Sequence, residues 1–220
     1  MELVPTQQDV VGLLRQTGAL RDGHFACPSG FHTSQYLETA LAMRYYHHAK
    51  TLSVGLSRLV RGEAELRAMI PELSIVAATP AGLPVAYGIC EALRARQVYW
   101  TEKPAPDRPM RFPPHLEPSP GERIVLVDDI LRSGALLREA AEVLESRGAR
   151  VVAVAVLVYQ PTPHTQDLGA VSLHYLARLE FECAIDPAHC ELCRQGVPLE
   201  QIGREPRELV VAAPAAADGC

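Results

Sequence analysis

The 220 residues are 48% hydrophobic and only 5% aromatic, enough aliphatic material for one α/β domain and too much for a largely disordered chain. The formal net charge of −5 argues against a broad basic face for nucleic acid, so a bound anion would need a local site. The N-terminus has no basic segment leading into an apolar one, and no apolar run reaches about 18 residues. We therefore expect a cytoplasmic protein without a nucleic-acid or membrane partner.

The elements expected before residue 101 are helices and short aliphatic strands. Apolar residues at helical spacing predict two early helices, with Thr6 as the N-cap of the first and Gly62 at the end of the second. A strand, a turn, a third helix and a second strand then follow. The expected ranges are 6–20 and 48–60 for the early helices, 23–42 for irregular or extended chain, 74–78 for the strand, 79–82 for the turn, 83–96 for the helix and 98–100 for the next strand.

The second half begins with a proline-rich segment, residues 101–121, which is expected to be a long mobile loop and a candidate lid. Aliphatic strands and one helix follow, as in a βαβ unit of a parallel sheet. The expected ranges are 123–127, 151–158 and 171–177 for the strands and 134–147 for the helix. We expect a single domain over residues 1–211 and a frayed tail at 212–220.

The segment 123–137 is the one most indicative of chemistry. A buried strand delivers Asp128 and Asp129 to its carboxyl end, and a turn with Ser133 and Gly134 then opens a helix. Ligands of open α/β sheets bind at such an edge, and the free amides of a helix start suit a phosphate monoester. The two carboxylates would then accept hydrogen bonds from ribose hydroxyls, directly or through Mg²⁺. The alternative is that the two acids merely cap a helix in another α/β protein.

This segment resembles the phosphoribosyl-pyrophosphate signature of type I phosphoribosyltransferases. The resemblance implies their α/β fold: a mostly parallel central sheet flanked by helices, with a small hood built from N-terminal and C-terminal segments. It also implies phosphoribosyl pyrophosphate and a nucleobase as substrates, Mg²⁺ as cofactor, and Asp128 and Asp129 as catalytic residues and metal contacts. The implied phosphate-binding residues are Arg132, Ser133, Gly134, Ala135 and Leu136. The family usually has Thr or Ser where Arg132 stands.

Within that family the sequence is most similar to orotate phosphoribosyltransferases, through residues 24–38, 79–86 and 99–103. The likeness implies a homodimer whose loop reaches the other subunit, with Lys103 as a catalytic cation. It places the base at Ser29, Gly30, Phe31 and Tyr36, and pyrophosphate at Pro80, Ala81 and Gly82. Those enzymes generally carry a basic residue at the position of Phe31.

Three functions remain open at this stage. The first is transfer of a 5-phosphoribosyl group to orotate, giving orotidine 5′-phosphate. The second is the same reaction with another base, for which Phe31 and Tyr36 could form a stacking pocket. The third is a non-catalytic regulator that senses phosphoribosyl pyrophosphate or a nucleotide, suggested by Arg132 and Leu136 in the phosphate turn.

A group of cysteines near the C-terminus has half the spacing of a zinc knuckle, in Cys190-x-x-Cys193. Cys183 and His189 are the nearby residues that could complete a structural zinc site with this pair. Reduced thiols are the preferred interpretation, because one Cys-x-x-Cys pair is a weak signal by itself.

Overall fold

The computed structural model describes residues 4–27, 30–105, 107–180 and 185–202. The chain forms two compact units: unit 1 contains Met1–Arg21 and Tyr36–Phe181, and unit 2 contains Asp22–Gln35 and Glu182–Cys220. Among the described residues, no helix combines the length and the apolar character needed to cross a bilayer.

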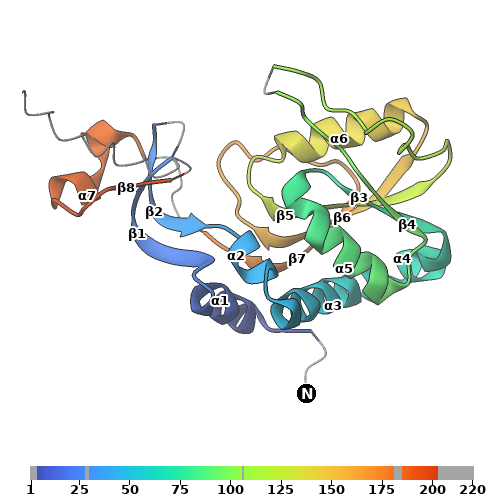
Figure 1. Cartoon of the computed structure of the whole chain (residues 1–220), viewed down its shortest axis with the longest axis horizontal. Helices are drawn as coiled ribbons and strands as arrows, with labels where there is room; N and C mark the ends of the chain where they lie inside the picture. The colour runs from blue at the N-terminus through green and yellow to red at the C-terminus, as the bar shows by residue number, and fades with distance from the viewer. Residues whose placement is uncertain (1–3, 28–29, 106, 181–184, 203–220) are drawn as a thin grey trace, which may run out of the picture. The chain divides into compact units, whose positions relative to one another are not determined.

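Unit 1 is built on a five-stranded sheet in the order β4-β3-β5-β6-β7, and every neighbouring pair is parallel (Figure 1). The strands are β3 (Leu73–Ala77), β4 (Gln97–Trp100), β5 (Arg123–Leu131), β6 (Arg150–Tyr159) and β7 (Ser172–Arg178). Ala77 at the end of β3 pairs with both Trp100 and Val127. β3 and β4 therefore end side by side, and β5 continues past them from Val127 to Leu131 at the edge where open α/β sheets bind their ligands.

Helices cover both faces of this sheet (Figure 1). The helices of unit 1 are α1 (Gln7–Gln16), α2 (Ala40–Met43), α3 (Tyr46–Gly62), α4 (Ala64–Met69), α5 (Leu83–Leu93) and α6 (Ala135–Ser146), with short 3₁₀ turns η1 (Ile70–Glu72) and η2 (Pro80–Gly82). The all-parallel sheet between helices confirms the fold class expected from the sequence.

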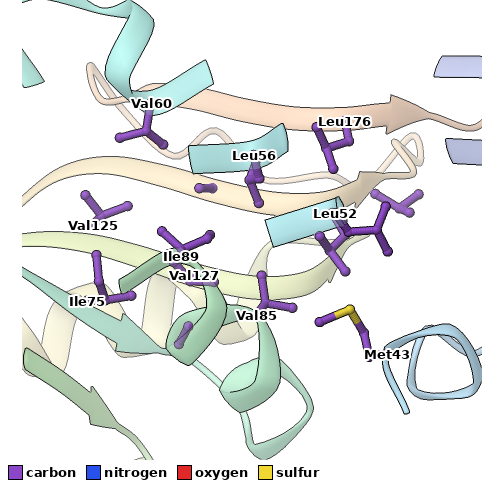
Figure 2. Packing of buried hydrophobic residues seen from close by; sticks show 14 of the residues in the cluster. Met43, Leu52, Leu56, Val60, Ile75, Val85, Ile89, Val125, Val127 and Leu176 are labelled. Atoms are coloured by element: carbon purple, nitrogen blue, oxygen red, sulfur yellow. The ribbon is translucent and has the colours of Figure 1, made fainter. Parts of the chain in front are cut away.

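The two faces carry separate hydrophobic clusters because successive residues of a strand point to opposite sides. On β5, Val125 and Val127 belong to the cluster of α3 and α5, while Ile124 and Leu126 belong to the cluster of α6. Figure 2 shows the first cluster, in which Val125 lies near side chains of α3 and α5. Burial of β5 on both faces fixes the position of the residues at its end.

Several boundaries differ from the sequence-based expectation. The first helix begins at its Thr6 cap as predicted, but it ends at Gln16 because Gly18 adopts a positive φ of 72° and β1 (Leu20–Ala26) starts directly afterwards. The third predicted helix ends at Leu93, where Arg94 takes a left-handed conformation. Helix α4 was not predicted. The chain at 23–42 contains strands and a short helix.

The loop 101–121 is partly anchored to unit 1. Met110 and Phe112 are buried in the cluster of α6, and Glu102 forms an antiparallel bridge with Arg111. These contacts bring both ends of the segment 103–109 together. The anchored part of the loop is therefore not available to act as a lid.

Unit 2 is small and combines two distant parts of the chain. β1 and β2 (His32–Leu37) supply its N-terminal part, and β8 (Glu200–Gln201) pairs in parallel with β1 through Phe25 and Ala26. Its other elements are η3 (Pro187–His189) and α7 (Glu191–Arg194). The single domain over 1–211 stays a prediction, and the tail at 212–220 lies outside the described residues.

Candidate phosphoribosyl site

The two aspartates are part of β5 itself, which continues to Leu131, rather than following the strand as the sequence suggested. Asp128 is 4% exposed and Asp129 is 9% exposed. Buried carboxylates require partners or a cation, because desolvation penalises the charged form. Their placement at the carboxyl edge of the sheet agrees with the predicted site.

Asp128 is held by the turn that follows β3. Its Oδ1 accepts a hydrogen bond of 2.6 Å from the Thr79 hydroxyl and one of 3.0 Å from the Asp129 amide. Burial, and then the adjacent Asp129 carboxylate, raise the pKa of Asp128 from 3.8 to about 7. The site thus carries a carboxyl group whose charge is costly until a cation or hydroxyl group approaches.

Asp129 is held by a different segment, the one that precedes α2. The Thr39 hydroxyl donates to its Oδ2, and the Ile130 amide donates to its Oδ1 at 2.9 Å. Thr39 is 1% exposed, so this contact lies in the interior. The segment before α2 and the strand β5 therefore fix the carboxylate jointly.

The turn from β5 into α6 offers main-chain donors. Gly134 caps the helix with a φ of 77°, a left-handed conformation in which a glycine costs least. The first backbone bond after it runs from the Arg138 amide to the Gly134 carbonyl, so the amides of residues 135–137 have no acceptor within the helix. Ser133 Oγ lies 3.4 Å from the Ala135 amide. Such a helix start suits a phosphate group.

Arg132 is positioned by the interior of unit 1. Its Nε donates to Gln160 Oε1 at 2.7 Å, and its guanidinium also reaches the Leu37 carbonyl at 3.4 Å. Gln160 is fully buried, which makes it a rigid support. Arg132 thus lies beside the turn before α6 as an oriented positive charge, and its partner Gln160 was not predicted.

These groups line one cavity of about 440 Å³ within unit 1. All five predicted phosphate-binding residues and both aspartates border it. Arg132 is the one cationic side chain among the described lining residues. The lining consists of Leu37, Glu38, Thr79, Ala81, Asp128, Asp129, Ile130, Leu131, Arg132, Ser133, Gly134, Ala135, Leu136 and Leu137.

The predicted pyrophosphate residues form the 3₁₀ turn η2. Ala81 borders the cavity, and Pro80 has no amide hydrogen to offer. The Gly82 amide already donates to the Thr79 carbonyl at 3.1 Å, so it is engaged inside the turn. Among these three residues, Ala81 is the one with an amide available for a ligand.

Lys103 is not among the described residues that line this cavity. Its Nζ pairs with Glu139 Oε2 on α6 at 2.5 Å, and the same carboxylate accepts the Met110 amide. A contact between Lys103 and a substrate would require this ion pair to open.

The predicted base-binding residues are divided between the units. Gly30 and Phe31 belong to unit 2, where Phe31 is 44% exposed, and Ser29 lies outside the described residues. Tyr36 belongs to unit 1, donates to Glu38 Oε2 at 3.4 Å and stacks under the Arg21 guanidinium. Their common role stays a prediction.

The donor set of the cavity fits Mg²⁺. Magnesium prefers carboxylate oxygens, usually one or two together with substrate oxygens and water. Asp128 and Asp129 are adjacent, buried and border the same cavity, and the pKa of Asp128 is raised by burial and by its neighbour's charge. A divalent cation beside the two carboxylates would offset both the desolvation and the charge repulsion that raise this pKa.

The cysteine prediction is partly changed by the structure. Cys190 and Cys193 do lie together, but their neighbours are His24 and His32. His189, which the sequence suggested as a further ligand, has a side chain 83% exposed and pairs with Asp186. Cys183 lies outside the described residues.

Three residues that contact the candidate site were not predicted from the sequence. Thr39 and Thr79 donate to the two aspartates, and Gln160 orients Arg132. The first contact joins residues 90 positions apart, so no local pattern could reveal it. Thr79 was within a segment predicted to bind pyrophosphate, where its role as an N-cap was the available signal.

The fold agrees with comparisons to known proteins. Residues 72–171 match the family model "Phosphoribosyl transferase domain". Orotate phosphoribosyltransferase of Thermus thermophilus is 30% identical over 195 residues, covering 88% of this chain and all of the relative. The Thermotoga maritima enzyme of the same name is 28% identical over 192 residues, covering 87% and 95%.

The solved structures give the same fold. Orotate phosphoribosyltransferase from Aeropyrum pernix superposes with a TM-score of 0.59 at 23% identity, covering 77% of this chain and 93% of that one. The extent of the sequence match, over nearly the full length of both proteins, decides the family. This chain is a phosphoribosyltransferase and belongs to the orotate phosphoribosyltransferase family.

Proposed function

We propose that this protein transfers the 5-phosphoribosyl group of phosphoribosyl pyrophosphate to orotate, giving orotidine 5′-phosphate and pyrophosphate. The observation that carries the proposal is the cavity bordered by both Asp128 and Asp129 and by the amide-rich turn at Ser133 and Gly134. Relatives named for this activity match along nearly their whole length.

The 5′-phosphate would bind the opening amides of α6, with the oriented guanidinium of Arg132 beside it. Asp128 and Asp129 would accept hydrogen bonds from the vicinal ribose hydroxyls, which keeps the carboxylates away from the phosphate charge. The helix dipole and the guanidinium favour the phosphate end, and the acids favour the diol end. The charges of the cavity are therefore complementary to a ribose 5-phosphate, with the positive end at the phosphate and the acids at the hydroxyls.

In the reaction, the bond between ribose C1 and the pyrophosphate oxygen breaks as a ring nitrogen of the base bonds to C1 and loses its proton. Mg²⁺ held near Asp128 and Asp129 would supply charge neutralisation for the leaving pyrophosphate. The residues of this chain hold the donor, orient it and stabilise charge at its two ends. We assign the amide of Ala81 to the pyrophosphate, since it borders the cavity after β3.

We further propose a homodimer in which Lys103 of one subunit serves the cavity of the other. Within its own chain Lys103 is paired with Glu139, and the described lining of the cavity includes one cation, Arg132. A leaving pyrophosphate requires more positive charge than that. Both units would belong to one phosphoribosyltransferase domain. The free thiols of Cys90, Cys190 and Cys193 are compatible with the reducing cytoplasm.

The decisive experiment measures pyrophosphate release by the purified full chain with Mg²⁺, phosphoribosyl pyrophosphate and orotate. Turnover with orotate that disappears in Asp128→Asn and Asp129→Asn variants is the expected result. Turnover with a purine or another pyrimidine but not with orotate would replace the base while keeping the reaction. Tight binding of the donor with no turnover across a panel of bases would favour the non-catalytic sensor.

A further inference from the structure

Unit 2 contains a cluster of four metal-ligand side chains that the phosphoribosyl site does not use. His24 and His32 come from β1 and β2, and Cys190 and Cys193 flank and enter α7. Their ligand atoms all lie within 4.8 Å of one another. Residues about 160 positions apart in the sequence thus converge on one point.

Four of the six separations between these ligand atoms lie close to the edges of a tetrahedral zinc site. Zn–N bonds of about 2.05 Å and Zn–S bonds of about 2.3 Å give tetrahedron edges of about 3.3 Å between two nitrogens and about 3.6 Å between nitrogen and sulfur. His24 Nε2 lies 3.1 Å from His32 Nδ1, 3.4 Å from Cys190 Sγ and 3.6 Å from Cys193 Sγ. Cys193 Sγ lies 3.3 Å from His32 Nδ1.

The orientation of His24 favours a cation over a set of ordinary hydrogen bonds. Its Nδ1 lies 2.9 Å from the Val197 carbonyl oxygen, which can only accept, so Nδ1 carries the proton. Nε2 then presents a single lone pair to three surrounding groups, His32 and the two sulfurs. One lone pair accepts one hydrogen bond, whereas a metal at the centre would satisfy all four groups. A second-shell carbonyl that fixes the tautomer is typical of metal-bound histidine.

Charge and burial are consistent with the same ion. His24, His32 and Cys190 are 3%, 6% and 1% exposed. Zn²⁺ with two thiolates and two neutral imidazoles has no net charge, so its burial carries no large desolvation penalty. Binding releases one proton from each thiol, giving Zn(SR)₂(His)₂ and two protons. The S₂N₂ donor set selects Zn²⁺ rather than Mg²⁺ or Ca²⁺.

The small size of unit 2 also favours a structural metal. Unit 2 comprises residues 22–35 and 182–220, and a single hydrophobic core in a unit this small contributes so little stability that disulfides or a structural metal are commonly added. Among the described residues, none of unit 2 belongs to either hydrophobic cluster. Half of the buried residues in the described part of unit 2 belong to the cluster itself; the buried residues there are His24, Phe25, Ala26, His32, Thr33 and Cys190.

We propose that His24, His32, Cys190 and Cys193 bind one structural Zn²⁺ that joins β1 and β2 to α7. All four positions are filled by the protein, so the site is closed and has no position for a substrate. Cys193 is exposed, which gives the metal a route of entry.

The test uses the full chain without a histidine tag, purified after growth with added zinc, and measures metal by mass spectrometry. One zinc per chain is expected, and Cys193→Ser and His32→Ala should lower zinc affinity at least about ten-fold. Cys27→Ser and His189→Ala are matched controls, since these residues lie near the cluster in sequence but outside it. Both controls should keep their zinc.

A second measurement covers the case in which the cluster variants fail to fold. The wild-type chain, stripped of metal and loaded with Co²⁺, should show thiolate-to-cobalt charge-transfer bands and the visible bands of a tetrahedral site. Absence of zinc together with absence of these bands overturns the proposal. So does a Cys190–Cys193 disulfide in freshly purified protein, or equal zinc in cluster and control variants.

Discussion

Gly82 packs directly against Asp128. A Cβ added at Gly82 would lie 2.9 Å from Asp128 Oδ1 and 3.1 Å from Asp128 Cα. The φ of Gly82 is −75°, so the position requires glycine for close approach rather than for an unusual backbone conformation. The turn after β3 and the acid on β5 are therefore fitted to each other without space for a methyl group.

Gly82→Ala should damage both stability and activity. The added methyl group must displace Asp128 or the turn, and overpacking of this kind lowers the free energy of unfolding by about 1–3 kcal/mol. Because Asp128 would shift relative to the ribose, we expect kcat/KM for phosphoribosyl transfer to fall about 100-fold. Urea denaturation and pyrophosphate release measure the two effects.

Gly12→Ala is the matched control for that substitution. Gly12 lies inside α1, and a Cβ there would meet no atom within 4 Å. Alanine is the better helix former, so this variant should gain up to about 1 kcal/mol in the free energy of unfolding and keep its activity. Similar behaviour of the two variants would refute the packing argument at Gly82.

The raised pKa of Asp128 predicts a pH-dependent cost in stability. The folded protein holds a proton on Asp128 up to about pH 7, while the unfolded chain loses it near 3.8. The folded state therefore binds more protons between about pH 4 and 7, and stability from this group declines as pH rises through that window. Asp128→Asn removes the charge and should melt several degrees higher than the wild type at pH 8, with little difference at pH 4.

Thermal melts across pH 4 to 8 in buffer without added Mg²⁺ measure this effect. Asp107→Asn is the control, because Asp107 is an exposed residue of the loop 101–121, and its melting difference should be flat across this range. A melting difference for Asp128→Asn that shrinks as pH rises would contradict the assignment of the buried charge.

Gln160→Leu should separate ligand binding from stability. Gln160 Oε1 orients Arg132, whereas its buried Nε2 has no hydrogen-bond partner among the described residues. Leucine removes the support for Arg132 but also removes the unsatisfied amide, so the free energy of unfolding should change by less than about 1 kcal/mol. The Kd for phosphoribosyl pyrophosphate should rise about ten-fold, measured by calorimetry.

Arg132→Ala provides the second arm of a double-mutant cycle. If Gln160 acts through the guanidinium, then Gln160→Leu should have no further effect on Kd in the Arg132→Ala background. Additive losses in Kd would mean that Gln160 influences the cavity by another route.

The sequence predicted the parts of this fold that depend on local patterns. The strand at 123–127 and the helix after Gly134 follow from aliphatic runs and a glycine turn, and both are present in the structure. The proposed phosphate turn rests on the same kind of local pattern, since its strand, acids, hydroxyl and glycine are contiguous. When the residues of a motif are contiguous, their local sequence determines how they are arranged.

Long-range contacts could not be predicted in this way. The Thr39 hydroxyl on Asp129 and the convergence of His24 with Cys190 depend on how distant segments fold back on one another. His189 was a plausible ligand because it adjoins Cys190, yet the 3₁₀ turn η3 places its side chain in solvent. Sequence proximity was a poor guide where the backbone turns within a few residues.

The proposed sharing of Lys103 between subunits can be tested by complementation. Lys103→Ala leaves the acids intact, and Asp128→Asn leaves the lysine intact, so each homodimer should lack complete sites. If Lys103 serves the partner's cavity, a heterodimer of the two variants regains one complete site of its two. An equal mixture that exchanges subunits freely should then recover about a quarter of wild-type activity, since half of its dimers are mixed. The Glu139 ion pair offers an alternative, in which Lys103 acts in its own chain or only anchors the loop. In that case one site of each mixed dimer has Asp128 but no lysine, and the other has Lys103 but no Asp128. Neither site is complete, so pyrophosphate release stays at the level of the separate variants.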